Sequence, residues 1–194
     1  MDEGNRRRIE EYVRPLAAGL DGVTNFGDTH RIVAASEAMA AGRSDLDRDL
    51  VYLLAVFSGQ DRWVSRMGHR SRTEMFLASL GVPAKTIRAL FRGLARLESA
   101  PATAEEEIAH DAVRLDGMGA RGIVRAVTEG RREGQSFLEV AAAIEEAARS
   151  PLRTERGEAL AAERRRTMLD FARGLAREEE EFGPSPRGGP SRDL

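Results

Sequence analysis

Residues 107–123 of the chain are EIAHDAVRLDGMGARGI, an apolar-periodic segment that runs directly into closely spaced glycines. The apolar residues of this segment recur at helical intervals: Ile108, Ala112 and Leu115. The spacing predicts an amphipathic helix. We expect Thr103 to cap it, because a glutamate follows at the spacing of a capping box.

Gly117, Gly119 and Gly122 end the segment in a pattern that resembles a phosphate cradle. No strand is predicted before them, so the P-loop and dinucleotide-binding interpretations fail. Close approach between helices accounts better for three glycines at this spacing.

Helical spacing dominates the rest of the chain, and no segment alternates in the manner of a strand. We expect further helices around Ile9–Leu20, from a cap at Asp28, from a cap at Ser44 through Phe57, on both sides of Gly81–Pro83, and over Ser136–Arg149 and Glu155–Glu181. Residues 50–57 are apolar all round, which predicts a helix at the centre of the domain. The sequence thus predicts a compact all-α domain over residues 1–182 and a disordered tail over 183–194.

Composition excludes several classes of protein. The 194 residues contain no cysteine, which removes disulfides, zinc–thiolate sites and iron–sulfur clusters, and they contain three histidines. No apolar run is long enough for a membrane span and no secretory signal is present, so we expect a cytoplasmic protein. The net charge of -2 argues against a nucleic-acid partner. Lys85 is the only lysine, and the many arginines would suit an anionic ligand.

The 107–123 segment closely resembles the Asp-Ala-Asp-x-Leu-Asp-x-x-Gly-x-x-Gly segment of HD-domain metal-dependent phosphohydrolases. Further resemblances to this family cover Asp28–Val33 (an opening His-x-x-Arg-Val helix), Leu53–Phe57 (the approach to the His-Asp dyad), Leu77–Pro83 (a helix–turn–helix corner), and Arg156–Ala161 with Arg165–Phe171 (the terminal helix). The resemblance implies an HD-domain-like fold.

The same resemblance implies that the metal centre of the family is lost. Family members bind a divalent metal through the adjacent His and Asp, an earlier histidine and a later aspartate. Ser58 and Gly59 stand at the two dyad positions, and Asp28 stands where the first histidine is expected. Only Asp111 matches a ligand position.

The three histidines are poorly placed to rebuild such a centre. His30 lies about 200° around a helix from Asp28, and His110 diverges from Asp111 by about 100°. His69 follows a glycine in an expected loop. We therefore expect all three to be surface or helix-end histidines.

A ligand pocket is the alternative use of this region, with Trp63 for stacking and Arg62 or Arg66 for an anionic group. The candidate pocket residues are Asp28, Ser58, Gly59, Arg62, Trp63, His69 and Asp111. Bulk solvation of the arginines and a tryptophan that covers the core edge are the plainer explanations of the same residues.

Three hypotheses follow. The first is a degenerate HD-fold protein without a cofactor, which serves as a ligand-binding or interaction module or as a metal-independent enzyme. The second is a metal-dependent phosphohydrolase with a carboxylate-rich site for manganese or magnesium. Its ligands would come from Asp28, Asp61 and Asp111 with His30 or His69, and Asp111 and Asp61 would be its catalytic residues. The third is a helical assembly partner, possibly a homo-oligomer, suggested by small-residue runs such as Ala141–Ala143.

Overall fold

The computed structural model describes residues 1–17, 26–59 and 69–182, and these residues form α-helices and no strand. The helices are α1 (Glu3–Ala17), α2 (Phe26–Ala40), α3 (Arg48–Phe57), α5 (His69–Ser79), α6 (Ala84–Leu94), α7 (Ala104–Asp116), α8 (Gly119–Glu133), α9 (Phe137–Arg149) and α10 (Glu155–Phe182). The all-α prediction is therefore confirmed for the described chain. None of its helices is long and apolar enough to cross a membrane.

Contacts divide the chain into two units. The first comprises residues 1–117 and 151–161, and the second comprises residues 118–150 and 162–194. The crossings fall after α7, before α10 and within α10. Every candidate site residue of the sequence analysis belongs to the first unit.

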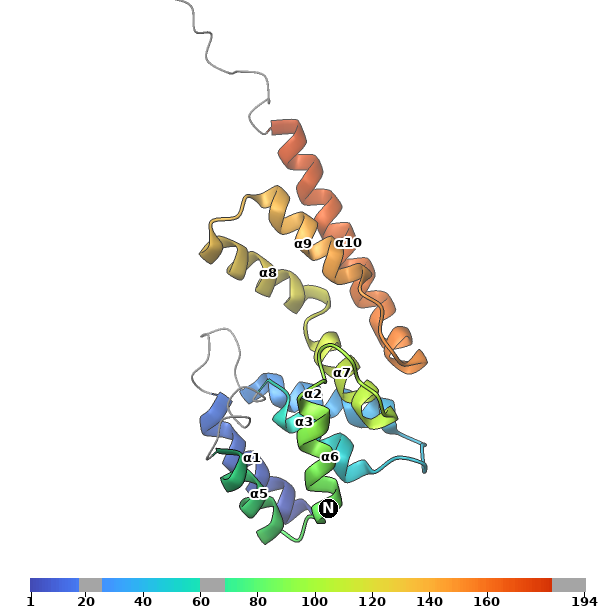
Figure 1. Cartoon of the computed structure of the whole chain (residues 1–194). Helices are drawn as coiled ribbons and strands as arrows, with labels where there is room; N and C mark the ends of the chain where they lie inside the picture. Colours follow the sequence, from blue (N-terminus) through green and yellow to red (C-terminus); the bar gives the residue numbers. More distant parts are fainter. Residues whose placement is uncertain (18–25, 60–68, 183–194) are drawn as a thin grey trace, which may run out of the picture. The chain divides into compact units, whose positions relative to one another are not determined.

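Helix α3 is the centre of the first unit, where it packs against α1, α2, α6 and α7 (Figure 1). Every residue from Leu50 to Phe57 is buried, as the all-round apolar pattern predicts. The helix begins at Asp47, whose carboxylate accepts a hydrogen bond from the Leu50 N–H at 3.1 Å. The predicted cap at Ser44 is wrong, because residues 44–46 form a bend in which Arg43 pairs with Asp45.

Two other predicted helix ends are confirmed. Thr103 caps α7 by accepting the Glu106 N–H at 3.3 Å. The corner at Gly81–Pro83 separates α5 from α6, with Gly81 at φ +78°. Asp28 is different: α2 already begins at Phe26, so Asp28 lies in the first turn and not at the cap.

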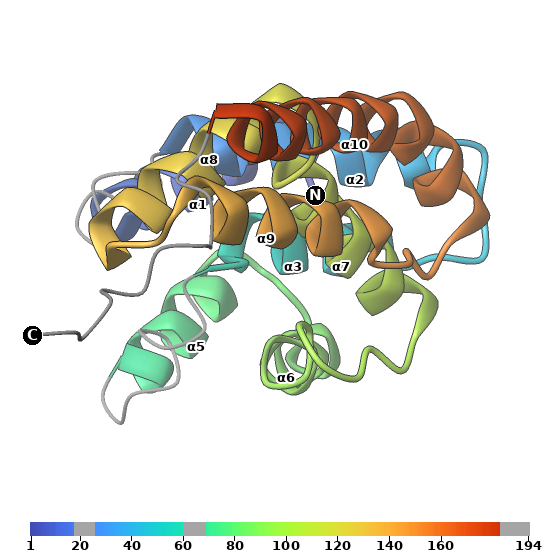
Figure 2. The same ribbon diagram turned by 90° about the horizontal axis from the view of Figure 1, so that it is seen from above.

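The second unit contains α8, α9 and the C-terminal part of α10. Figure 2 shows α9 running alongside this part of α10. The sequence prediction missed α8, because three glycines near its start conceal the helical period. Gly119 has φ +72°, and a Cβ there would lie 3.3 Å from Arg164 Cγ, so this glycine does serve a close approach.

Candidate functional site

One arginine links two buried carboxylates in the first unit. The guanidinium of Arg31 in α2 donates through Nε to Asp116 Oδ1 at 2.9 Å and through Nη2 to Asp28 Oδ1. Asp28 lies one turn earlier on the same helix, whereas Asp116 ends α7, which packs against α2. The Asp28 and Asp116 side chains are 2% and 4% exposed, and that of Arg31 is 40% exposed. We call these three residues the Arg31 cluster.

Asp111, one of the most buried residues of α7, anchors the start of α10. Its carboxylate accepts the backbone N–H of Arg153 at 2.9 and 3.0 Å. It also accepts the N–H and the hydroxyl of Thr154, each at 2.7 Å. His110 Nδ1 lies 2.9 Å from Asp111 Oδ1. Since an ionised carboxylate only accepts, that nitrogen carries the proton.

These contacts keep Asp111 ionised. Burial raises the pKa of the carboxyl, but the hydrogen bonds from His110, Arg153 and Thr154 outweigh burial and leave the pKa below its usual value. Gly157 is the nearest part of α10: a Cβ there would lie 2.6 Å from Asp111 Oδ2. The first turn of α10 therefore fits over the carboxylate only because residue 157 has no side chain.

The fold has close relatives among solved structures. The Lin1889 protein from Listeria innocua is 20% identical, with a TM-score of 0.74 over 93% of this chain and 98% of the other. Bacillus subtilis YpgQ in complex with ADP is 19% identical, with a TM-score of 0.68 over 90% and 95% of the two chains. An HD-superfamily hydrolase from Bacillus thuringiensis is 17% identical, with a TM-score of 0.66 over 92% and 96%.

The fold is HD-domain-like. This confirms the resemblance drawn from the 107–123 segment. No protein-family profile matches the chain, and no curated protein matches it in sequence. At these identities the similarity establishes the fold, and the chemistry depends on the residues of this chain.

The two dyad positions of the HD fold fall at the end of α3. Ser58 follows the last residue of the helix and is buried, and its hydroxyl donates to the Ala55 carbonyl at 2.7 Å. Gly59 has φ +77°, and a Cβ there would meet no atom within 4 Å. A side chain at 59 would have room, but the left-handed backbone favours glycine.

The structure distributes the other candidates. His69 is the first residue of α5, and Asp61, Arg62, Trp63 and Arg66 lie outside the described residues. His30 is exposed on α2, as expected. The expectation for His110 is wrong, since it is buried at 5% exposure and bonded to Asp111. The 100° divergence of helix neighbours holds at Cβ, but the imidazole is long enough to turn back to the adjacent carboxylate.

No group of three or more His, Asp or Glu side chains that could hold a metal ion is found within residues 1–17, 26–59 and 69–182. Asp28 belongs to the Arg31 cluster, whereas Asp111 faces the start of α10. The described carboxylates at family ligand positions therefore serve two separate arrangements.

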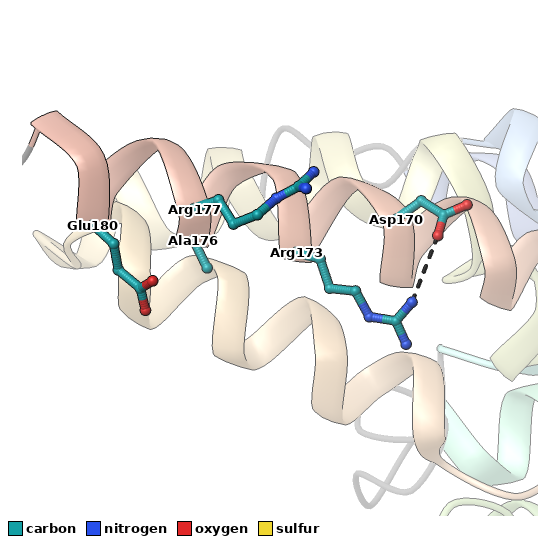
Figure 3. A pocket seen from close by; sticks show the side chains of 5 residues that line it. All are labelled: Asp170, Arg173, Ala176, Arg177 and Glu180. Carbon is teal, nitrogen blue, oxygen red and sulfur yellow. Dashed lines mark ion pairs between the residues drawn. The ribbon is translucent and has the colours of Figure 1, made fainter.

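Two surface hollows are lined by described residues. One of about 450 Å³ lies beside the start of α10, and its lining includes Arg43, Glu155 and Arg156. Arg43 is paired with Asp45, and Arg156 donates to the Ala41 carbonyl, so its charges are largely compensated. The other, of about 520 Å³, is lined along α10 by Asp170, Arg173, Ala176, Arg177 and Glu180 (Figure 3). Neither hollow contains a buried reactive group.

The sequence analysis did not assign roles to Arg31, Asp116, Arg153, Thr154 and Gly157. One of them carried a usable sign: Thr154 immediately precedes Glu155, and threonine is a preferred N-cap. Its hydroxyl accepts the Gly157 N–H at 3.0 Å. The remaining roles depend on contacts between segments far apart in the chain.

Proposed function

We propose that this chain is an HD-fold protein that no longer holds the family's divalent metal. It acts as a binding module for an anionic small molecule or a partner, or as an enzyme whose chemistry needs no metal. The observation that carries the proposal is the ion pair between Asp28, at the first ligand position, and Arg31.

A permanently charged guanidinium on Asp28 opposes metal binding there. Arginine stays protonated at any pH at which proteins fold, so Asp28 has a partner that does not dissociate by losing its proton. Arg31 also binds Asp116, and together these bonds fix two edges of the guanidinium. A divalent ion at Asp28 would have to displace this cation or lie beside it.

Asp111 is committed in a different way. A carboxylate offers about four lone-pair sites. Its donors are His110 Nδ1, the Arg153 and Thr154 N–H groups, and the Thr154 hydroxyl. Binding a metal through Asp111 would therefore require the start of α10 to release the carboxylate. Ser58 and Gly59 supply no replacement, since a hydroxyl is a poor ligand for a transition metal and glycine has no side chain.

The ligand class follows from the composition and from one relative. The arginine content favours an anion, and YpgQ, which shares the fold, is known in complex with ADP. ADP without metal is therefore the first probe. Purified protein is stripped with EDTA, its metal content is measured by elemental analysis, and it is titrated by calorimetry with MnCl₂ and separately with ADP.

We expect less than a tenth of an equivalent of transition metal, no saturable manganese binding, and saturable binding of ADP in EDTA. A tightly held stoichiometric metal would overturn the loss of the centre. Absence of ADP binding would reject the nucleotide and leave an interaction module, for which sedimentation of the wild type tests self-association.

The hydrolase fold of the relatives favours a second candidate, a phosphohydrolase with a non-standard metal site at Asp28, Asp61 and Asp111 with His30 or His69. A panel of nucleotides and phosphoesters is assayed with manganese and with magnesium. Turnover that disappears in Asp111→Asn, while that variant keeps its fold by circular dichroism, would favour this candidate. If Asp111→Asn folds and retains full turnover, the proposed ligand set is wrong.

A further inference from the structure

We propose that Arg31 is a built-in cation for Asp28 and Asp116, and that without it these carboxylates form a binding site for a divalent cation. The inference rests on the proposed function, in which the native chain holds no metal. It explains how an HD fold keeps two buried acidic side chains near a position where its relatives use a metal ligand.

The geometry of the Arg31 cluster resembles salt-like coordination. One positive group contacts an oxygen of each carboxylate, through Nη2 to Asp28 and through Nε to Asp116 at 2.9 Å. The two carboxylates come from α2 and α7, so the cation joins two helices. Because both contacts use Oδ1 atoms, a single cation placed between those oxygens would reach both.

Charge makes such a cation necessary. Both carboxylates are almost fully buried, at 2% and 4% exposure of their side chains. Burying two like charges without a counter-ion is costly, because each loses hydration and they repel one another. Removal of Arg31 would leave this pair to be neutralised by protons or by a cation from solution. The 40% exposure of the Arg31 side chain indicates that solvent reaches the cluster.

The donor chemistry selects the class of ion. Carboxylate oxygens suit magnesium, manganese and calcium. Magnesium is commonly bound through one or two carboxylates, with water completing its coordination. Two carboxylates and water can thus hold such an ion weakly, with a dissociation constant on the order of 10⁻⁴ to 10⁻³ M. Manganese is the probe, because its free form is measured directly by electron paramagnetic resonance.

The experiment compares four full-length proteins after EDTA treatment and dialysis: wild type, Arg31→Ala, Arg31→Lys and the double variant Asp28→Asn/Arg31→Ala. Each is titrated with MnCl₂, and bound manganese and the melting temperature are measured. We expect one equivalent of saturable manganese, with a metal-dependent rise in melting temperature, only in Arg31→Ala. Arg31→Lys keeps a positive charge without the planar fork, so it tests whether charge alone excludes the ion.

The outcomes separate the two proposals. If neither wild type nor Arg31→Ala binds manganese, the built-in cation is rejected and the proposed function stands. If wild type binds manganese as well as Arg31→Ala does, both are rejected. Binding retained by the double variant places the ion elsewhere and rejects the inference. Should Arg31→Ala not fold in EDTA, Arg31→Met preserves the apolar stem, and folding that requires manganese supports the inference.

Discussion

The carboxylate of Asp111 accepts both the backbone N–H and the hydroxyl of Thr154, 43 residues away, at 2.7 Å each. One side chain of α7 thus satisfies the amide that begins α10 and the hydroxyl that caps it. A buried anion at the N-terminus of a helix is also favoured by the helix dipole. Asp111 therefore stabilises the fold, whatever ligand the protein binds.

Replacing Asp111 by alanine should cost about 3 kcal/mol of the free energy of unfolding, because several buried donors lose a charged acceptor. Urea unfolding followed by circular dichroism measures it. Asp45→Ala is the matched control: it removes an exposed aspartate paired with Arg43 and should cost less than about 0.5 kcal/mol. Equal losses in the two variants would contradict the anchor.

Gly157→Ala should destabilise the protein by about 1–3 kcal/mol, because the new Cβ would meet Asp111 Oδ2 at 2.6 Å and Thr154 Oγ1 at 2.8 Å. Gly174→Ala lies on the same helix and meets nothing within 4 Å. There the higher helix propensity of alanine should stabilise by up to about 1 kcal/mol. Opposite shifts in the urea midpoint are expected, and a stabilising Gly157→Ala would refute the close packing over Asp111.

Stability should fall in acid partly through Asp111. Its pKa is lowered in the folded state, so the unfolded chain binds more protons and the contribution is fully present above the unfolded value of about 3.9. The contribution is lost as the pH falls through the lower folded pKa. Asp111→Asn should therefore differ most from wild type at pH 7 and progressively less below pH 4. Urea midpoints from pH 7 to pH 3 measure this, and a constant difference would exclude the linkage.

Ser136→Ala should destabilise α9 by about 1 kcal/mol, because Ser136 and Glu139 form a reciprocal capping box. Ser150 stands at the other end of the helix, where its hydroxyl only donates to the Glu146 carbonyl at 3.2 Å. Ser150→Ala is therefore the control and should change stability by less than about 0.5 kcal/mol. A loss confined to Ser150→Ala would contradict the cap.

Local pattern was sufficient for most helices. The apolar run of α3, the cap at Thr103 and the corner before Pro83 each depend on residues within a few positions of one another. Helix α8 escaped prediction for the same reason, because glycine lowers local helical preference and only packing restores it. The cap of α3 was misplaced because serine and aspartate are both good caps and the sequence offers both.

The candidate site was predicted only in its residue types. From the sequence alone, the chain has an HD-like helical pattern, serine and glycine at the dyad, and aspartates at positions 28 and 111. The tertiary structure decided what those aspartates contact: Asp28 pairs with Arg31, and Asp111 holds Thr154. Helical periodicity is fixed by bonds within a few residues, so sequence specifies it. The partner of a buried charge is chosen by whichever helix packs over it, and only the folded chain brings that helix into place.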